Sequence, residues 1–331
     1  MIKNWIPRGI AFCEFDQEFQ TESFTFVLLP EFSMNAFSSA VEPLRLANQL
    51  TGKEIFHWRC VSEDGQPVEC SNGVTVGVNG TMDDISTTDA VLVCSGVNPE
   101  KNASRKVADQ IRRLWRQGQT VGGICTGAYT LAQAGILQGS AFTLHWENLL
   151  AFQERYPQLE ASDQIYTFDR RIWTCAGGSA PTDMMICRIR RCYGSLLAGT
   201  ISSMCLHDVA RHHQQRQKSS LAATFNVKSR KLIEIAEFME THLDELGSLD
   251  DVAYRFGISR RQMERLFRKY MATTPKKFVI LSRLYRARSL MSETNINVAD
   301  AAAACGFSSA SHFSRRFKDI FGVSPQDYSA S

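Results

Sequence analysis

A cysteine in a glycine-rich stretch is the clearest candidate for reactive chemistry in this chain. Residues 121–137 read VGGICTGAYTLAQAGIL, in which an apolar strand pattern is followed at once by Cys125 and then by a helical pattern. Gly122, Gly123 and Gly127 leave room for the backbone to reverse directly from strand into helix. This is the nucleophile-elbow arrangement with Cys in place of Ser. The dipole of the following helix is expected to favour its thiolate.

A second kind of chemistry, recognition of nucleic acid, is indicated by a stretch that occurs twice. Residues 248–275 and 297–325 each contain a short apolar helix pattern, a glycine turn, a second helix and a closing proline. We therefore expect two helix-turn-helix units. Arg and Gln read base edges in the major groove, while Ser and further Arg hold phosphates. The side chains expected to contact DNA are Ser259, Arg260, Arg261, Gln262 and Arg265 in the first copy and Ser309, Ser311, His312, Arg315 and Arg316 in the second.

The elements that must position these side chains follow from apolar spacing and turn residues. Gly257 and Gly306 supply the turns, and Ser259 and Ser308 are placed to cap the helices that follow. The second copy has one more residue between its glycine and its proline, so we expect its turn to bulge. The inner faces of the second helices are predicted to be Met263, Leu266 and Phe267 in the first copy and Phe313, Phe317 and Ile320 in the second.

The segment between the copies, 276–294, has apolar residues at helical spacing and predicts one long helix. It would hold the two units at a fixed separation, about 34 Å if they meet successive major grooves. A basic helix face can also be no more than a solvated charge run. The recurrence of turn, cap and basic face together argues against that simpler interpretation.

Two units joined by a linker helix, with GFSSASHFSRRFKDIFGVSPQDY in the second, resemble the AraC-type DNA-binding domain over residues 228–331. The resemblance implies a transcription regulator, expected to be an activator, with double-stranded promoter DNA and RNA polymerase as partners and a homodimer as a possible form. Residues 228–331 hold 17 Lys and Arg against 12 Asp and Glu, whereas residues 1–227 are net negative. The basic excess therefore lies where phosphate binding requires it.

The earlier part of the chain alternates short apolar runs with amphipathic helices. Strands are expected at 24–29, 56–61, 90–94 and 120–124, and helices at 36–50, 103–117, 126–134, 180–193 and 195–211. This alternation predicts an α/β domain, flavodoxin-like with a mainly parallel sheet, followed by the all-α domain. The expected division is a loosely held N-terminal arm (1–22), a ligand-sensing domain (23–206), a linker (207–227) and the DNA-binding domain (228–331).

With this alternation around it, the Cys125 turn resembles the PfpI-like domain of the class I glutamine amidotransferase superfamily, over about residues 23–200. The whole chain is similar to amidotransferase-like AraC regulators, in which such a domain senses a small molecule. HWENL (145–149) and TCAGGSAPTDMM (174–185) resemble the subgroup that answers to arginine, glycine betaine or carnitine-type metabolites. The resemblance therefore implies a small nitrogenous effector.

Catalysis by this domain is not expected. Active PfpI-like domains place a His directly after the Cys and a Glu just beyond the first strand, where this chain has Thr126 and Met34. His145 and Glu147 could act as base and orienting group, but they follow Cys125 more closely than the His-x-Glu of amidotransferases does. We expect a small thiol that lines a binding pocket. The alternatives are a Cys125-dependent amidase, deglycase or glyoxalase-like enzyme fused to a DNA-binding domain, and a ligand-independent dimerisation platform.

Ligands of parallel sheets bind beyond the carboxyl ends of the strands. The ligand-binding residues predicted there are Met34, Phe37, Ser95, Cys125, Thr126, His145, Trp146 and Asp183, together with Gly96, Gly177 and Gly178. For a quaternary ammonium ligand we expect an aromatic cage of Trp146 and Phe37, with Glu42 or Asp183 as the nearby acid. Each aromatic side chain could equally be a core residue, and His145 an ordinary hydrogen-bonded histidine.

The remaining composition excludes several classes of protein. The ten cysteines are scattered without a C-x-x-C pair, which indicates buried thiols in a reducing compartment. The N-terminus has acidic residues where a signal peptide needs an apolar run, and no stretch approaches about 18 apolar residues. We expect a cytoplasmic protein with no membrane contact and no cofactor. His212 and His213 lack further ligands at metal-binding spacing, so no metal site is predicted.

Overall fold

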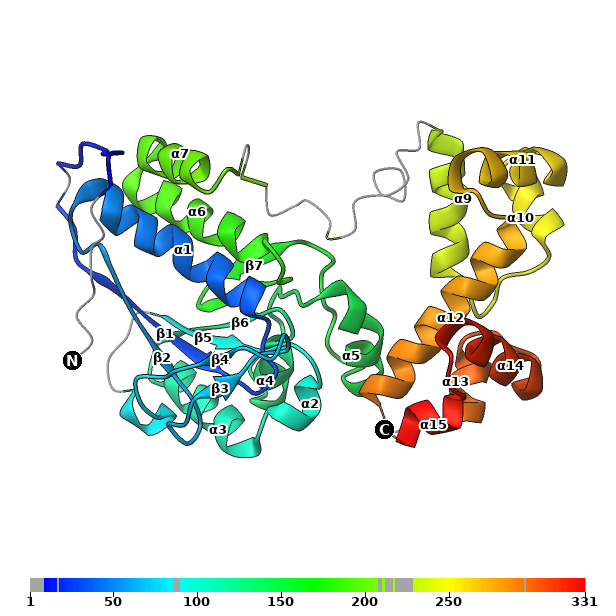
Figure 1. The fold of residues 1–331 in the computed structure, drawn as a ribbon, viewed down its shortest axis with the longest axis horizontal. Coiled ribbons are helices and arrows are strands. Elements are labelled where there is room, and N and C mark those ends of the chain that lie inside the picture. Colours follow the sequence, from blue (N-terminus) through cyan, green and yellow to red (C-terminus); the bar gives the residue numbers. More distant parts are fainter. Residues whose placement is uncertain are drawn as a thin grey trace. The chain divides into compact units, whose positions relative to one another are not determined.

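The computed structural model describes residues 9–16, 18–85, 90–207, 210–211, 217, 229–294 and 296–330. The chain divides into two compact units, Met1–Gln217 and Lys218–Ser331 (Figure 1). Within the described residues, no helix combines the length and the apolar character needed to cross a bilayer.

A six-stranded sheet forms the centre of the first unit. Its strands are β1 (Glu22–Leu28), β2 (Phe56–Val61), β5 (Ala90–Cys94), β6 (Thr120–Ile124), β7 (Tyr166–Asp169) and β8 (Ile172–Cys175), in the order β2-β1-β5-β6-β8-β7. Neighbouring strands are parallel except β7 with β8. A separate antiparallel pair joins β3 (Val68–Glu69) to β4 (Thr75–Val76). The predicted flavodoxin-like, mainly parallel sheet is confirmed.

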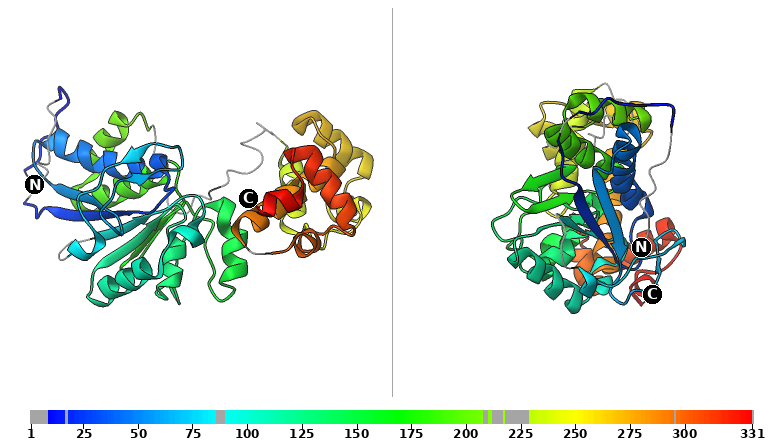
Figure 2. Two further views of the ribbon diagram at one scale, coloured as in Figure 1. Left: turned by 60° about the horizontal axis from the view of Figure 1, so that its bottom comes forward. Right: turned by 90° about the vertical axis from the view of Figure 1, so that its left-hand side faces the viewer.

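Helices cover both faces of this sheet (Figures 1 and 2). One face carries α1 (Met34–Thr51), α6 (Ala180–Tyr193) and α7 (Ser195–Met204), and the other carries α3 (Arg105–Arg116), α4 (Ala128–Gln133) and α5 (Leu149–Arg155). Short helices α2 (Pro99–Asn102), η1 (Met82–Asp84) and η2 (Trp146–Asn148) lie in connections. Successive side chains of β5 enter opposite cores, which explains why this strand is apolar at every position.

Several elements of this unit differ from the sequence-based predictions. Strands β7 and β8 and helix α5 were not predicted, and the helix expected over 195–211 ends at Met204. The N-terminal arm is not loosely held where it is described. Cys13 and Phe15 are buried against the first unit, and the Cys13 amide donates to Leu50 O at 2.8 Å. Apolar side chains between the acidic residues hold this segment.

The predicted linker (207–227) also begins too early. His207, Arg211 and Gln217 all hydrogen-bond within the first unit, so its compact part extends to Gln217. The buried carboxylate of Asp183 draws two of these side chains onto the domain. His212 and His213 lie outside the described residues.

The second unit is all helical, with α9 (Arg230–Thr241), α10 (Leu249–Arg255), α11 (Arg260–Met271), α12 (Pro275–Glu293), α13 (Val298–Ala304), α14 (Ala310–Phe321) and α15 (Pro325–Ala330). It has two separate hydrophobic cores. Helices α9, α10 and α11 enclose the first, and α13, α14 and α15 enclose the second. The predicted long helix is α12, which contributes Phe278 and Val279 to the first core and Leu284 and Ala287 to the second. Each helix-turn-helix therefore has its own core, and α12 is common to both.

Candidate functional site

The second helix of each helix-turn-helix, α11 and α14, begins with a serine cap. Ser259 Oγ accepts from the Gln262 amide at 3.2 Å, and Gln262 Oε1 accepts from the Ser259 amide at 2.8 Å. In the second copy Ser309, rather than Ser308, accepts from the His312 amide at 3.3 Å. The extra residue of this copy lies in the turn, so the cap moves one position along the chain. The side-chain amide nitrogen of Gln262 takes no part in this cap and can donate to DNA.

The basic side chains expected at the DNA surface differ in their availability. Arg260 is held by Asp250 at 2.8 Å and Glu264 at 3.3 Å. Arg316 lies 3.7 Å from Asp319. Arg261, Arg265 and Arg315 are exposed, and within the described part of the chain no ion pair is recorded for them. These three are the cations best placed to meet a phosphate or a base without breaking an existing contact.

The predicted inner faces of these helices are mostly confirmed. Met263, Phe267, Phe313 and Phe317 are buried. The prediction for Ile320 is wrong, because 50% of its surface is exposed. Ser311 is exposed and His312 is half-buried, with its ring centroid 6.1 Å from that of Phe307.

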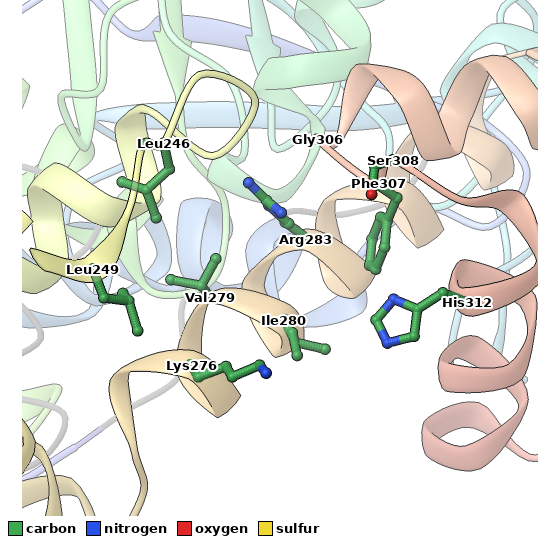
Figure 3. Close-up of a pocket in the computed structure, with 11 residues that line it drawn as sticks. Leu246, Leu249, Lys276, Val279, Ile280, Arg283, Gly306, Phe307, Ser308 and His312 are labelled. Carbon is green, nitrogen blue, oxygen red and sulfur yellow. The ribbon is translucent and has the colours of Figure 1, made fainter. Parts of the chain in front are cut away.

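A groove of about 250 Å³ separates the two helix-turn-helix units (Figure 3). Arg283 of α12 crosses beside it, and its Nε donates to Leu243 O at 2.8 Å. Gly306 packs so closely here that an added β-carbon would lie 2.8 Å from the Arg283 guanidinium. The groove is lined by Leu246, Gly247, Leu249, Lys276, Val279, Ile280, Arg283, Gly306, Phe307, Ser308 and His312. Arg283, which was not singled out from the sequence, therefore connects the two helix-turn-helix units.

In the first unit, the strand ends bring the Cys125 turn to the predicted edge of the sheet. Leu28, Cys94, Ile124 and Cys175 are in register at the carboxyl ends of four neighbouring strands. Cys125 follows with φ of 61°, a left-handed conformation that a nucleophile elbow imposes on its central residue. A β-carbon at Gly127 would lie 2.4 Å from Val93 O, so only glycine permits this close return of the chain.

Backbone and hydroxyl contacts join the loops around Cys125. Its amide donates to Cys175 O at 3.0 Å, and its carbonyl accepts from the His145 amide at 3.1 Å. Thr126 Oγ1 donates to Gly96 O at 2.7 Å and lies 3.0 Å from Ser95 Oγ. The structure thus brings together five of the predicted residues. Ser95 and Thr126 are buried and bound to each other, which leaves them as supports of the site.

The predicted thiolate character of Cys125 is wrong. Burial raises the pKa of the Cys125 thiol to about 12, and only a weaker effect of the Thr126 amide opposes it. Burial also lowers the pKa of His145, while nearby Glu147 raises it. His145 Nδ1 lies 3.9 Å from Glu147 Oε2. Desolvation is the largest effect on this thiol, so the buried sulfur is a neutral thiol near pH 7.

Glu31, just beyond β1, is the acid that lies nearest in sequence to Met34, the position where the resemblance to active PfpI-like domains would place a Glu. Its Oε2 accepts from Asn98 Nδ2 at 2.9 Å and from Asn102 Nδ2 at 2.8 Å. The Asn102 and Asn98 hydrogen bonds lower the pKa of this carboxyl. Glu31 is therefore engaged in holding the loop before α2.

The predicted aromatic and acidic ligands have different surroundings. Met34 is the first residue of α1, and Phe37 packs edge-on against Phe26 and Phe32, as a core residue does. Trp146 is 44% exposed, with its ring centroid 5.5 Å from that of His145. Glu42 is exposed and pairs with Arg45 at 2.7 Å. Trp146 is thus the more exposed of the two predicted aromatic residues.

Asp183 is fully buried and bound by side chains that the sequence did not single out. It accepts from His207 Nε2 at 2.8 Å and from Arg211 Nη2 at 2.7 Å. Both residues were placed in the linker because the polar composition of HDVARHHQQRQ carries no periodicity. Among the described residues, no group of three or more His, Cys, Asp or Glu is placed to hold a metal ion.

Comparison with known proteins supports the folds of both units. A helix-turn-helix domain model matches residues 252–331, and the DJ-1/PfpI family model matches residues 34–189. The HTH-type transcriptional regulator GbdR of Pseudomonas aeruginosa is 38% identical over 306 residues, which cover 92% of this chain and 83% of that protein. CdhR of the same organism is 38% identical over 305 residues, covering 92% and 90%. The crystal structure of an AraC family transcriptional regulator from Pseudomonas putida superposes with a TM-score of 0.51 at 26% identity, covering 56% of this chain and 99% of that one.

The fold, the two helix-turn-helix units and these matches define a transcription regulator. Within that class the chain belongs to the AraC family, in the group whose DNA-binding domain follows a DJ-1/PfpI domain.

Proposed function

We propose that this protein activates transcription by binding promoter DNA through both helix-turn-helix units, and that a small nitrogenous metabolite in the first unit controls this binding. One observation carries the proposal. Arg265 and Arg315 stand at the sixth position after their respective caps, Ser259 and Ser309, and both are exposed. A matched pair of unpaired cations on two equivalent helices suits two successive major grooves.

The first unit supports an effector site rather than an enzyme. The neutral, buried Cys125 thiol lacks the ionisation that a nucleophile needs. Trp146 and the loops at the carboxyl edge of the sheet instead offer a surface for a cation of the arginine, glycine betaine or carnitine type. Such a ligand would change the relative stability of two states of the regulator by binding one of them better.

Genomic DNA fragments selected by the full-length protein, followed by footprinting, test the DNA-binding part. We expect two protected patches about 34 Å apart along one face of the duplex. Arg315→Ala is expected to weaken only the patch contacted by the second helix-turn-helix. Arg105→Ala, at an exposed position on α3, is the matched control and should leave both patches unchanged. A single patch, or equal footprints for Arg315→Ala and wild type, would contradict the proposal.

Thermal melting of the full-length protein with L-arginine, glycine betaine or L-carnitine tests the effector part. A ligand that binds the folded state raises the melting temperature in a saturable manner. A turnover assay with small amides and dicarbonyls, run beside Cys125→Ser, would reveal the enzymatic alternative.

A further inference from the structure

The buried carboxylate of Asp183 holds a cation from the end of the first unit. Asp183 is 0% exposed, and its Oδ2 accepts from Arg211 Nε at 3.0 Å and Arg211 Nη2 at 2.7 Å. The same Nη2 donates to Ser179 Oγ at 2.8 Å. On the other oxygen, Oδ1, Asp183 accepts from His207 Nε2 at 2.8 Å and from the Arg211 amide at 2.5 Å. The guanidinium is thus recognised by a carboxylate and a hydroxyl, as a bound organic cation would be.

The segment that supplies this cation has a second anchor. Gln217 Nε2 donates to Thr143 Oγ1 and Leu144 O, both at 2.8 Å, and to Gln164 O at 3.1 Å. The Gln217 amide donates to Asp163 O at 2.8 Å. We call the described residues of this segment, His207, Ala210, Arg211 and Gln217, the strap.

Both anchors of the strap touch loops that flank Cys125. A β-carbon at Gly177 would lie 2.9 Å from Cys125 Sγ, and the hydroxyl of Ser179, two residues further on, binds Arg211. On the other side, Leu144 accepts from Gln217, and the next residue, His145, donates its amide to Cys125 O. The strap therefore spans two loops that flank Cys125, and the second unit begins directly after it at Lys218.

We propose that Asp183 and Ser179 form the cation subsite of the effector site and that Arg211 is its built-in occupant. An effector bearing a guanidinium or ammonium group competes with Arg211 for this subsite, and its arrival frees the strap. That this subsite belongs to an effector site, and that its release controls DNA binding, rests on the proposed function above, whereas the binding of a cation by Asp183 and Ser179 does not.

The burial of Asp183 determines when Arg211 stays bound and when it leaves the subsite. A buried carboxylate without a cation is strongly unfavourable, so Arg211 stays bound in the absence of a replacement. An incoming cation removes that cost because the carboxylate keeps a partner throughout the exchange. The strap is therefore released by cations that fit beside Ser179, and raised salt alone does not release it.

Chemical rescue of full-length Arg211→Ala tests the subsite. We expect this variant to melt below wild type and to regain most of the difference in methylguanidinium chloride, with a saturable dependence that wild type lacks. Tetramethylammonium chloride distinguishes the two cation classes. If it rescues the variant as well as methylguanidinium does at equal concentration, the subsite selects for charge and size. If its rescue is weaker, the subsite also requires the hydrogen bonds of a guanidinium. Rescue by neither salt, or equal rescue by sodium chloride, overturns the proposal. Arg105→Ala is the control and should respond to none of them.

Release of the strap is measured by hydrogen exchange of peptides that cover residues 205–217. We expect at least tenfold faster exchange in Arg211→Ala than in wild type and a return towards wild type in Arg211→Lys, which keeps the charge and the fold. Unchanged exchange in both variants overturns the proposal. Neither measurement involves DNA. Failure of the rescue would therefore contradict the cation subsite, whereas an unchanged footprint in Arg315→Ala would contradict the proposed DNA binding.

Discussion

Gly306 lies against the side chain of Arg283, and a methyl group on its α-carbon would stand 2.8 Å from the guanidinium Nη2. Gly257, the equivalent turn residue of the first copy, has φ of +63° with open space around it. The two glycines thus share a left-handed backbone and differ in their surroundings.

This contrast predicts unequal costs for the same substitution. Gly257→Ala should lose about 1 kcal/mol of unfolding free energy, because the left-handed conformation is unfavourable for alanine. Gly306→Ala should lose a further ~1–3 kcal/mol, because the added methyl must also displace Arg283 and the Leu243 carbonyl. Urea unfolding of the two full-length variants measures the difference. Equal losses of unfolding free energy in the two variants would show that Arg283 moves away from the added methyl group without an energetic cost.

Arg261→Ala should weaken specific promoter binding by ~1–3 kcal/mol, as the loss of a base-contacting side chain does. Arg260→Ala should cost less than half of that, because this guanidinium is already engaged with Asp250 and Glu264. Fluorescence anisotropy with a selected promoter fragment at fixed salt measures both. If the larger loss belonged to Arg260, the ion pairs of α11 would have to open on DNA.

Cys125 should react slowly with iodoacetamide in the native protein. With its pKa raised to about 12, roughly one thiol in 10⁴ to 10⁵ is ionised at pH 7.5. Because the thiolate is the reacting form, the rate should rise about tenfold per pH unit between pH 7 and 9. Mass spectrometry of alkylated peptides, with exposed Cys192 as the internal control, gives the rates. Faster labelling of Cys125 than of Cys192 at pH 7.5 would revive a nucleophilic role.

Trp146→Ala should reduce the melting shift caused by the effector by half or more without a large change in the melting temperature of the free protein. An exposed cation–π contact contributes about 0.5–1 kcal/mol, and the side chain is 44% exposed, so little core packing is lost. Tyr254→Ala, an aromatic truncation at an 87% exposed position of α10, is the control. An undiminished shift in Trp146→Ala would remove this ring from the effector site.

Long periodic segments could be predicted from the sequence because periodicity alone determines them. The helix expected at 276–294 is α12, and the strand expected at 120–124 is β6. The hairpin of β7 and β8 escaped prediction, since each strand has four residues and the left-handed position of its turn is held by Arg170 rather than by glycine.

The site could be predicted less completely than the fold. Position at the strand ends brought Ser95, Cys125 and Thr126 together as expected, because parallel strands share an edge. A buried thiol was expected, but the strength of its desolvation could not be foreseen, and this desolvation reversed the expected ionisation of Cys125. The partners of Asp183 come from a polar stretch without periodicity, so only the folded chain reveals that Arg211 reaches it.

Helix α12 has 19 residues and is therefore about 28 Å long at ~1.5 Å per residue. Because its two halves are built into separate cores, α12 sets the separation and the relative orientation of the two helix-turn-helix units. If both helix-turn-helix units bind one duplex, as proposed, promoters of this regulator must keep their two recognition sequences in helical phase. Insertion of about five base pairs between them would turn the distant one to the opposite face of the duplex, out of reach of α14.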